Sequence, residues 1–511
     1  VVQPQVKTLP RLHISDLVPS PPKRMGTDFT QVETDNLIDK VNKNLPQEVN
    51  QPAISQGEPL KELEAQTLGE ILQRAALENS TKGVVYIQPD GTEFVQSYKN
   101  LLEDAQRLLG GLRKLGLKPQ DKVIFQLADN HNFISAFWGC ILGGFIPVPI
   151  SATGNLNKLQ NSWQMLGKPL VLSEQKLAPK LHQWAEELKL KNFQIEPIEP
   201  LKDSEEDRNW HKSNSEDLVL LLLTSGSTGM PKAVMHNHRS LLSRSASTIQ
   251  FNGFSKEDIS LNWFSLDHVG GIVMFHLRDV YLGCQQIHAP TELVLQEPTR
   301  WLDWISHYRA TITWAPNFAY GLIVQELENR QKTGSQQENH RGWDLSSMHF
   351  ILNAGEAIVA KTVRRFLEVL GQYQLQDRAM HPAWGMSETS SAVTFSSKFL
   401  LSSTTDEQKF VEVGSPVPGF AIRIVDNQNQ IVKETMAGRV QVKGPSVTSG
   451  YYQNTEANQD AFTEDGWFNT GDIGFLQQGC LTITGRQKDI IIINGLNYYS
   501  HEIEATIEEI E

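Results

Sequence analysis

Small and hydroxyl-bearing residues follow directly on an apolar stretch near the middle of the chain, where the sequence reads LLLLTSGSTGMPK. Small residues let backbone N–H groups approach phosphate oxygens, hydroxyls add donors, and a lysine adds charge. A Walker loop is excluded, because it needs four residues between its glycines and a Lys followed by Ser or Thr. Here Gly226 and Gly229 are three apart and Ala233 follows the lysine. We predict a phosphate-binding loop made of Thr224, Ser225, Gly226, Ser227, Thr228, Gly229 and Lys232.

Four later segments carry side chains that could complete a nucleotide site. They read NAGEA from Asn353, WGMSE from Trp384, WFNTGD from Trp467 and GRQKD from Gly485. The aspartate that ends the third segment could accept hydrogen bonds from two hydroxyls at once. Taken singly, each segment could equally be a helix cap or a surface turn.

Together with the phosphate loop, these segments resemble the superfamily of acyl-CoA synthetases, peptide-synthetase adenylation domains and luciferases. The resemblance covers about residues 65–511 and preserves the family's motif order. It implies that the loop holds the β- and γ-phosphates of ATP and that the NAGEA segment lines the adenine and acyl pockets. The residues carried over from that segment are Gly355, Glu356 and Ala357.

The resemblance also assigns roles to the remaining motifs. It implies that Trp384, beside Gly385, stacks near adenine, where the family usually has Tyr, and that Ser387 contacts the α-phosphate. Glu388 would hold Mg²⁺. Asp472 would take both ribose hydroxyls, Arg486 would contact the ribose, and Asp489 would be the hinge between a large and a small domain. The residues expected to act in catalysis are Thr224, Lys232, Ser387 and Glu388.

The acid-binding residues are less clearly indicated. In amino-acid-activating relatives an Asp pairs with the substrate ammonium. Asp267 matches the position of that Asp when the segment is counted forward from Phe264, and His268 matches it when the segment is counted back from Leu282-Gly283. The Gly270-Gly271 pair favours the histidine, with Asp267 as a cap of the following helix. The other pocket candidates, Asn317, Phe318, Leu352, Ala354 and Met386, offer no fixed counter-charge.

These residues predict the activation of a hydrophobic, amine-free acid, such as an aryl or phenylpropanoid acid, to acyl-AMP. The resemblance implies ATP and Mg²⁺ as cofactors and transfer of the acyl group to a phosphopantetheine thiol. A carrier protein of a mixed peptide–polyketide assembly line is favoured over CoA as acceptor, by analogy. The alternatives are a fatty acyl-AMP ligase, an acyl-CoA synthetase, an amino-acid adenylation domain and, in a different class, a non-catalytic nucleotide-binding relative.

Composition narrows the class further. The 511 residues carry a net charge of −13, with no basic run that would suit a nucleic acid. The three cysteines, Cys140, Cys284 and Cys480, lack metal-ligand spacing, which indicates a reducing, cytoplasmic setting. The most apolar stretch, residues 136–150, is too short to span a bilayer and contains three Gly and two Pro, so no membrane partner is expected.

Alternating short apolar strands and longer helices predict an α/β fold with parallel sheets and crossover helices. We expect a leader at residues 1–60, an adenylation core of stacked mixed sheets at 61–411, and a β subdomain at 412–485 whose strands leave no room for helices. Residues 486–511 would be the hinge and the truncated start of a small α+β domain. The family's small domain supplies a lysine for adenylation, and we find no matching lysine within this chain.

Overall fold

The computed structural model describes residues 50–79, 81–154, 156–225, 231–332, 342–486, 490–493 and 496–499, the last two ranges and Ser225 by backbone alone. Phosphate-loop residues 226–230 and the expected hinge residue Asp489 lie outside the described residues, as does the helix expected from Ser500. Among the described helices, none combines the length and the apolar character needed to cross a lipid bilayer.

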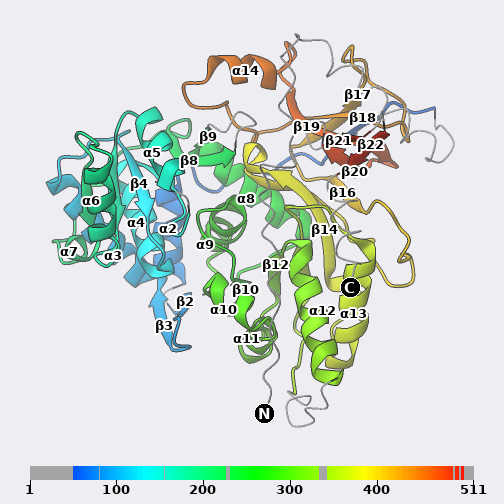
Figure 1. The fold of residues 1–511 in the computed structure, drawn as a ribbon, viewed down its shortest axis with the longest axis horizontal. Coiled ribbons are helices and arrows are strands. Elements are labelled where there is room, and N and C mark those ends of the chain that lie inside the picture. The colour runs from blue at the N-terminus through cyan, green and yellow to red at the C-terminus, as the bar shows by residue number, and fades with distance from the viewer. Residues whose placement is uncertain are drawn as a thin grey trace, which may run out of the picture.

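A four-stranded sheet built from residues 122–197 forms one side of the molecule (Figure 1). Its strand order is β5-β4-β6-β7 and every pair is parallel, as the strand–helix alternation predicts. The strands are β4 (Lys122–Gln126), β5 (Ile146–Pro149), β6 (Leu170–Ser173) and β7 (Ile195–Pro197). The associated helices are α4 (Asn130–Gly143), α5 (Leu156–Met165), α6 (Ala178–Glu187) and α7 (Glu199–Lys202).

The described strands also form a 14-stranded mixed sheet, in the order β1-β17-β18-β19-β20-β16-β15-β14-β13-β12-β10-β11-β2-β3. The half that contains β2, β11, β10, β12, β13 and β14 is parallel, whereas the strands from β14 to β1 pair antiparallel. The fold is therefore mixed α/β, as predicted. The strands are β1 (Ile54–Gln56), β2 (Gly83–Ile87), β3 (Glu93–Ser97), β10 (Ile259–Asn262), β11 (Gln285–His288), β12 (Ile312–Ala315), β13 (Phe350–Asn353), β14 (Met380–Met386), β15 (Ser391–Phe395), β16 (Glu412–Pro416), β17 (Ala421–Val425), β18 (Gly438–Lys443), β19 (Phe468–Gln477) and β20 (Cys480–Arg486).

Residues of the expected leader take part in this sheet. Ile54–Gln56, which we placed in a linker, is the edge strand β1 and pairs with β17. The opposite edge is β3, which comes from residues 93–97. One amino-terminal stretch thus supplies both edges of the sheet.

The strand before the phosphate loop differs from the expected parallel arrangement. β8 (Leu218–Ser225) pairs antiparallel with β9 (Pro231–Asn237) in a separate two-stranded sheet. The phosphate loop is consequently the connection of a hairpin, which sets Thr224 directly opposite Lys232.

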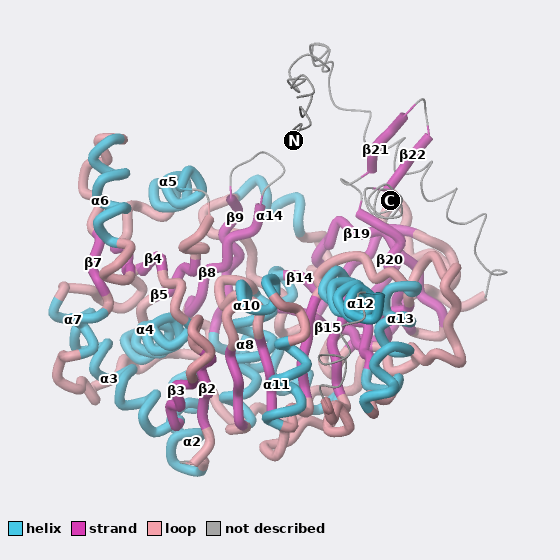
Figure 2. Tube along the Cα trace, turned by 60° about the horizontal axis from the view of Figure 1, so that its bottom comes forward, coloured by secondary structure: helices cyan, strands magenta, loops and turns pink. Residues whose placement is uncertain are grey.

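The helices are capped as their sequences suggest. Ser97, Asp129 and Asn237 accept a backbone N–H at the starts of α3, α4 and α8, and Gly144 ends α4 in the left-handed conformation. Figure 2 shows α12 and α13 beside each other next to the large sheet. The remaining helices are α2 (Leu68–Glu78), α3 (Tyr98–Lys114), α8 (His238–Asn252), the π-helix η2 (Gly270–Leu277), α9 (Arg278–Leu282), α10 (Thr291–Gln296), α11 (Arg300–Tyr308), α12 (Asn317–Lys332) and α13 (Ala360–Leu370).

The carboxyl-terminal β region holds one element that the sequence did not reveal. Helix α14 (Thr455–Ala461) lies between β18 and β19, where we expected no helix. Its first turn is capped by Asn454, whose side chain accepts from the N–H of Ala457. Beyond β20, β21 (Ile490–Ile493) and β22 (Leu496–Tyr499) pair as an antiparallel hairpin.

Candidate active site

The β8–β9 hairpin places a lysine beside the phosphate loop. Thr224 and Lys232 are register partners, and the Thr224 hydroxyl donates to the Lys232 carbonyl over 3.5 Å. The Lys232 ammonium lies 4.7 Å from the centre of the Tyr451 ring, on its face. Val234 forms an isolated bridge with Tyr451, which fixes that ring against β9. The hairpin therefore fixes the direction of the lysine toward Tyr451.

Tyr451 connects this lysine to the acidic residue Glu388. The phenol donates a 2.9 Å hydrogen bond to Glu388 Oε1, and Glu388 is 6% exposed. Burial raises the pKa of Glu388, while the Tyr451 hydrogen bond and the charges of Arg486 and Lys232 act in the opposite direction. Lys232, Tyr451 and Glu388 thus form one contiguous cluster of cation, aromatic ring and carboxyl group.

The turn that carries Ser387 and Glu388 has an unusual backbone. Residues 387–389 form a single 3₁₀ turn, and Ser390 and Ser391 follow with φ of 57° and 104°. Gly385 permits the tight β14–β15 hairpin here, because a Cβ would lie 2.1 Å from the Ser391 carbonyl oxygen. His236 bonds the Ser390 hydroxyl at 3.1 Å, so buried polar groups hold this strained turn from behind.

A second cluster brings together three residues expected to bind the nucleoside. The indole N–H of Trp384 donates to Asp472 Oδ2 over 2.8 Å, and Arg486 Nε donates to Asp472 Oδ1 over 2.9 Å. Asp472 is 2% exposed, whereas the Arg486 side chain is about half exposed. A Tyr at position 384 has no indole donor, so the tryptophan adds a contact that we did not anticipate.

Aromatic rings line the region of the acid-pocket candidates. The His268 ring stacks on Trp314 with centroids 6.1 Å apart and planes at 19°, and Phe264 lies 4.7 Å from Trp314. Trp314 is the register partner of Leu352, so the two side chains lie on one face of the sheet. Ala354 follows β13 in the same buried cluster, and Met386 packs against that cluster. The region is apolar and aromatic on that face.

The structure corrects one expectation here. Asp267 does not cap the helix that follows: its carboxylate accepts from the Ser265 hydroxyl. The His268 ring Nδ1 instead accepts from the N–H of Gly270, at 3.1 Å. The histidine thereby makes the contact expected of Asp267, and its exposed imidazole, two residues before η2, stacks on Trp314.

The remaining candidates lie around the end of β13. Asn317 is buried and its side-chain oxygen accepts from Asn353 and from the N–H of Val359, both at 3.2 Å. Phe318 is 41% exposed, and its N–H donates to Glu356 over 2.6 Å. Gly355, Glu356 and Ala357 are all exposed, and Gly355 has φ of 96°. Phe318 and residues 355–357 thus form an exposed rim, and the hydrogen bonds of the buried Asn317 hold the backbone behind it.

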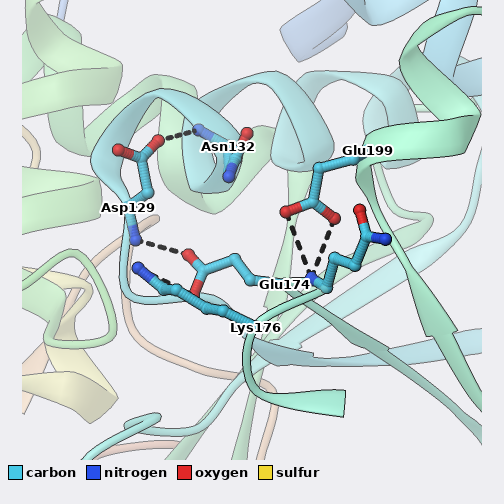
Figure 3. Close-up of a pocket in the computed structure, with 6 residues that line it drawn as sticks. Asp129, Asn132, Glu174, Lys176 and Glu199 are labelled. Atoms are coloured by element: carbon cyan, nitrogen blue, oxygen red, sulfur yellow. Dashed lines mark hydrogen bonds and ion pairs between the residues drawn. The ribbon is translucent and has the colours of Figure 1, made fainter. Parts of the chain in front are cut away.

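A separate polar hollow lies at the carboxyl ends of β4 and β6, distant in the chain from these clusters (Figure 3). Its carboxylates accept backbone N–H groups: Glu174 from Ala128 and Asp129, and Glu199 from Gln175. Lys176 lies 3.9 Å from Glu174. The acidic side chains therefore fasten the loops of the small sheet to one another.

Comparison with protein families decides the identity of this arrangement. The family described as AMP-binding enzyme matches residues 72–452 of the chain. The chain belongs to the AMP-binding enzymes. The resemblance that the motifs indicated is thus confirmed over most of the chain.

Relatives of this AMP-binding enzyme include assembly-line synthetases. Nonribosomal peptide synthetase apvA of Aspergillus terreus (strain NIH 2624 / FGSC A1156) is 32% identical over 451 residues, which are 85% of this chain and 48% of that protein. The chain spans about half the length of the curated relatives it matches.

Two solved structures are more similar in sequence. The adenylation domain of a keto acid-selecting NRPS module, bound to keto acyl adenylate, is 43% identical; the match covers 90% of this chain and 87% of that one, with a TM-score of 0.81. McyG A-PCP, complexed with phenylalanyl-adenylate, is 44% identical; the match covers 89% and 82%, with a TM-score of 0.85. The family and these relatives identify the enzyme class as an ATP-dependent, adenylate-forming ligase.

Three residues of this AMP-binding enzyme were missed by sequence reasoning. Tyr451 lies in a GYY segment with no distinctive spacing, and its contacts with Lys232 and Glu388 arise only from the fold. Trp314 lies in an apolar strand and Phe264 follows one, and neither was among the predicted site residues. A tryptophan at the carboxyl end of a parallel strand was the one available signal, because ligands bind at that edge.

Proposed function

We propose that this enzyme converts a hydrophobic aryl acid without an α-ammonium group into acyl-AMP, and passes the acyl group to the phosphopantetheine thiol of a carrier protein. The acid class is a phenylpropanoid or a related arylalkanoic acid. The observation that carries the proposal is the group of aromatic rings His268, Trp314 and Phe264, next to the apolar Leu352 and Ala354. Aromatic rings favour stacked or edge contacts with an aryl group.

One oxygen of the Asp267 carboxylate accepts a hydrogen bond from the neutral Ser265 hydroxyl, and the side chain keeps its negative charge. A keto acyl adenylate bound to a relative of 43% identity supports an amine-free acid.

The two polar clusters are suited to ATP. Lys232, with Thr224 beside it and Ser387 on the opposing turn, would bind the phosphates. Asp472 and Arg486 would bind the ribose, with Trp384 next to the base. The substrate carboxylate attacks the α-phosphorus in line and pyrophosphate leaves, so these residues act by alignment and by neutralising charge.

Glu388 fits a Mg²⁺ site of the kind that uses one protein carboxylate together with substrate phosphates and water. No group of three or more His, Cys, Asp or Glu side chains among the described residues could hold a metal alone. Bound at Glu388, Mg²⁺ would neutralise charge on the phosphates. Tyr451 would orient the carboxylate toward it.

An amino acid is the second candidate substrate, because a relative of 44% identity is complexed with phenylalanyl-adenylate. Pyrophosphate exchange with 3-phenylpropionate, phenylpyruvate, octanoate and phenylalanine distinguishes the candidates. We expect the two amine-free aryl acids to support the fastest exchange. Faster exchange with phenylalanine would contradict the proposed acid class, and exchange with no acid would contradict the activity itself.

A further inference from the structure

Arg244 of α8 is a buried guanidinium behind the acid region. It is 1% exposed, and its Nε donates to the Ser391 hydroxyl over 2.8 Å. Nη2 lies 2.7 Å from the Met274 sulfur, and the guanidinium carbon lies 5.8 Å from the centre of the Phe395 ring. All three neighbours are uncharged.

No carboxylate of the described residues lies within ion-pair distance of Arg244, and its Nη1 has no hydrogen-bond partner among them. The other fully buried arginine, Arg278, is 2.5 Å from Asp279. Burial, and then the charge of Arg278, lower the pKa of Arg244 to about 9, so it remains protonated at neutral pH. Burying a charge without a partner is costly, and the empty donor therefore calls for a ligand.

The position of Arg244 indicates which part of a ligand it would meet. β15 starts at Ser391, just after the turn that holds Glu388, and runs away from it at about 3.3 Å per residue. Arg244 contacts both Ser391 and Phe395, three and seven residues after Glu388 along the chain. Met274 belongs to η2, and the adjacent Phe275 stacks on Trp314 at 5.9 Å. The guanidinium therefore lies between β15 and η2, next to the residue whose ring stacks on Trp314.

We propose that Arg244 determines acid specificity by donating from Nη1 to an oxygen substituent on the aryl end of the acid. This inference rests on the proposed function and narrows its substrate class to ring-hydroxylated aryl acids. Hydrogen bonds from a charged donor are strong, and a site built to bond a hydroxyl rejects the analogue that lacks it.

Matched acid pairs test this proposal by binding, independently of turnover. Dissociation constants of 3-(4-hydroxyphenyl)propionate and 3-phenylpropionate are measured by calorimetry with saturating α,β-methylene-ATP. We expect the wild-type enzyme to bind the hydroxylated acid about 10- to 100-fold more tightly. Arg244→Met should reduce this ratio to about 1 and weaken binding of the unsubstituted acid little.

Two further variants keep the test informative. Arg244→Lys retains charge but loses the planar fork, and should give an intermediate ratio. Arg239→Met, on the exposed side of the same helix, should leave the ratio unchanged, because Arg239 pairs only with Glu216 at the surface. Thermal unfolding shows whether each variant folds, and replacing an unpaired buried charge by Met should not lower the Tm.

A wild-type ratio near 1, or the same ratio in wild type and Arg244→Met, would overturn the role of Arg244. That result leaves the proposed function intact if pyrophosphate exchange occurs with either acid. Absence of both exchange and acid binding would instead overturn the proposed function together with this inference.

Discussion

Glu388 shows how one side chain can combine burial with a functional charge. Because burial raises its pKa, the folded state favours the protonated form, and stability falls as the pH rises from the ordinary carboxyl range through the raised pKa. Ionisation of this carboxylate in the folded state thus comes at some cost to stability. A group of this kind is retained for function more readily than for folding.

Glu388→Gln keeps the shape and the acceptor for Tyr451 but removes the charge. We expect adenylate formation to fall by roughly 10²-fold or more, the scale for loss of a preorganised electrostatic group. The Tm without nucleotide at pH 7 should stay the same or rise. Pyrophosphate exchange and thermal unfolding of the same preparation measure both. Full exchange activity would exclude Glu388 from the site, and Tyr451→Phe serves as a milder variant of the same contact.

His268 and Asp267 differ in what they contact, so their substitution should have different effects. His268→Ala removes a ring stacked on Trp314 and should weaken acid binding by about 2- to 12-fold, since aromatic pairs contribute roughly 0.5–1.5 kcal/mol. Asp267→Ala removes only a local bond with Ser265 and should change acid binding by less than about twofold. Calorimetric titration of an aryl acid compares the two. Loss of activity in Asp267→Ala with phenylalanine as the best substrate would reverse the assignment.

At this scale the sequence predicted residues held in local motifs and missed those brought in by the fold. Trp384, Glu388, Asp472 and Arg486 lie in recognisable segments, and the structure gathers them in two clusters. Tyr451 could not be predicted, because it meets Glu388 from 63 residues away. The Asp267 capping expectation failed because an imidazole can accept the same N–H.

Helix η2 is held unusually close to strand β12. A Cβ on Gly270 would lie 2.3 Å from Trp314 Cη2, so the glycine is what permits this approach. π-helical segments are often found at functional sites, and here the segment directs the Phe275 and His268 rings to Trp314.

Gly270→Ala should therefore disturb the aromatic wall. We expect a loss of about 1–3 kcal/mol of stability from overpacking and at least tenfold weaker binding of aryl acid, with ATP affinity retained. Gly321→Ala is the matched control, because its Cβ would meet only the Thr362 methyl at 3.6 Å inside α12. That control should be neutral or stabilising. Chemical denaturation and calorimetry give both quantities; unchanged acid affinity in Gly270→Ala would show that Trp314 does not line the pocket.

The periodicity of apolar residues made most helices and strands predictable, whereas the partners with which the strands pair were predicted less well. Apolar runs such as residues 122–126 and 146–149 identified their strands, because fully buried parallel strands have few alternatives. The antiparallel pairing of β8 with β9 was missed, because the alternation of strands and helices along the chain favoured parallel pairing. The short helix α14 was not predicted, because its sequence TEANQDA has no apolar face.

On the scale of the whole molecule, β1 closes the large sheet. Its three residues pair with β17, and the adjacent Ala53, Gly57 and Glu58 add further backbone bonds to Val432, Phe420 and Gly419. These contacts protect a strand edge that would otherwise be exposed.

Removing β1 should therefore weaken the antiparallel half of the sheet. A chain that begins at Pro59 should have a lower Tm than one that begins at Asn50, by an amount that reflects roughly 1 kcal/mol per lost backbone bond. ATP binding should be retained in both, since the nucleotide clusters lie on other strands. Differential scanning calorimetry makes the comparison, and equal Tm values would show that β1 contributes nothing to the closure.

The same strand has a consequence for how the protein is made on the ribosome. Roughly 365 residues separate Gln56 from its partner Ala421, so at about 5–20 residues per second β1 waits about 20–70 seconds for β17 to be synthesised. An edge left open for that long could recruit other nascent chains. The three-residue sequence Ile-Ser-Gln, with a single apolar side chain, is too short and too polar to do so. The partner of this pair that is translated earlier is thus one that can remain unpaired safely until β17 is made.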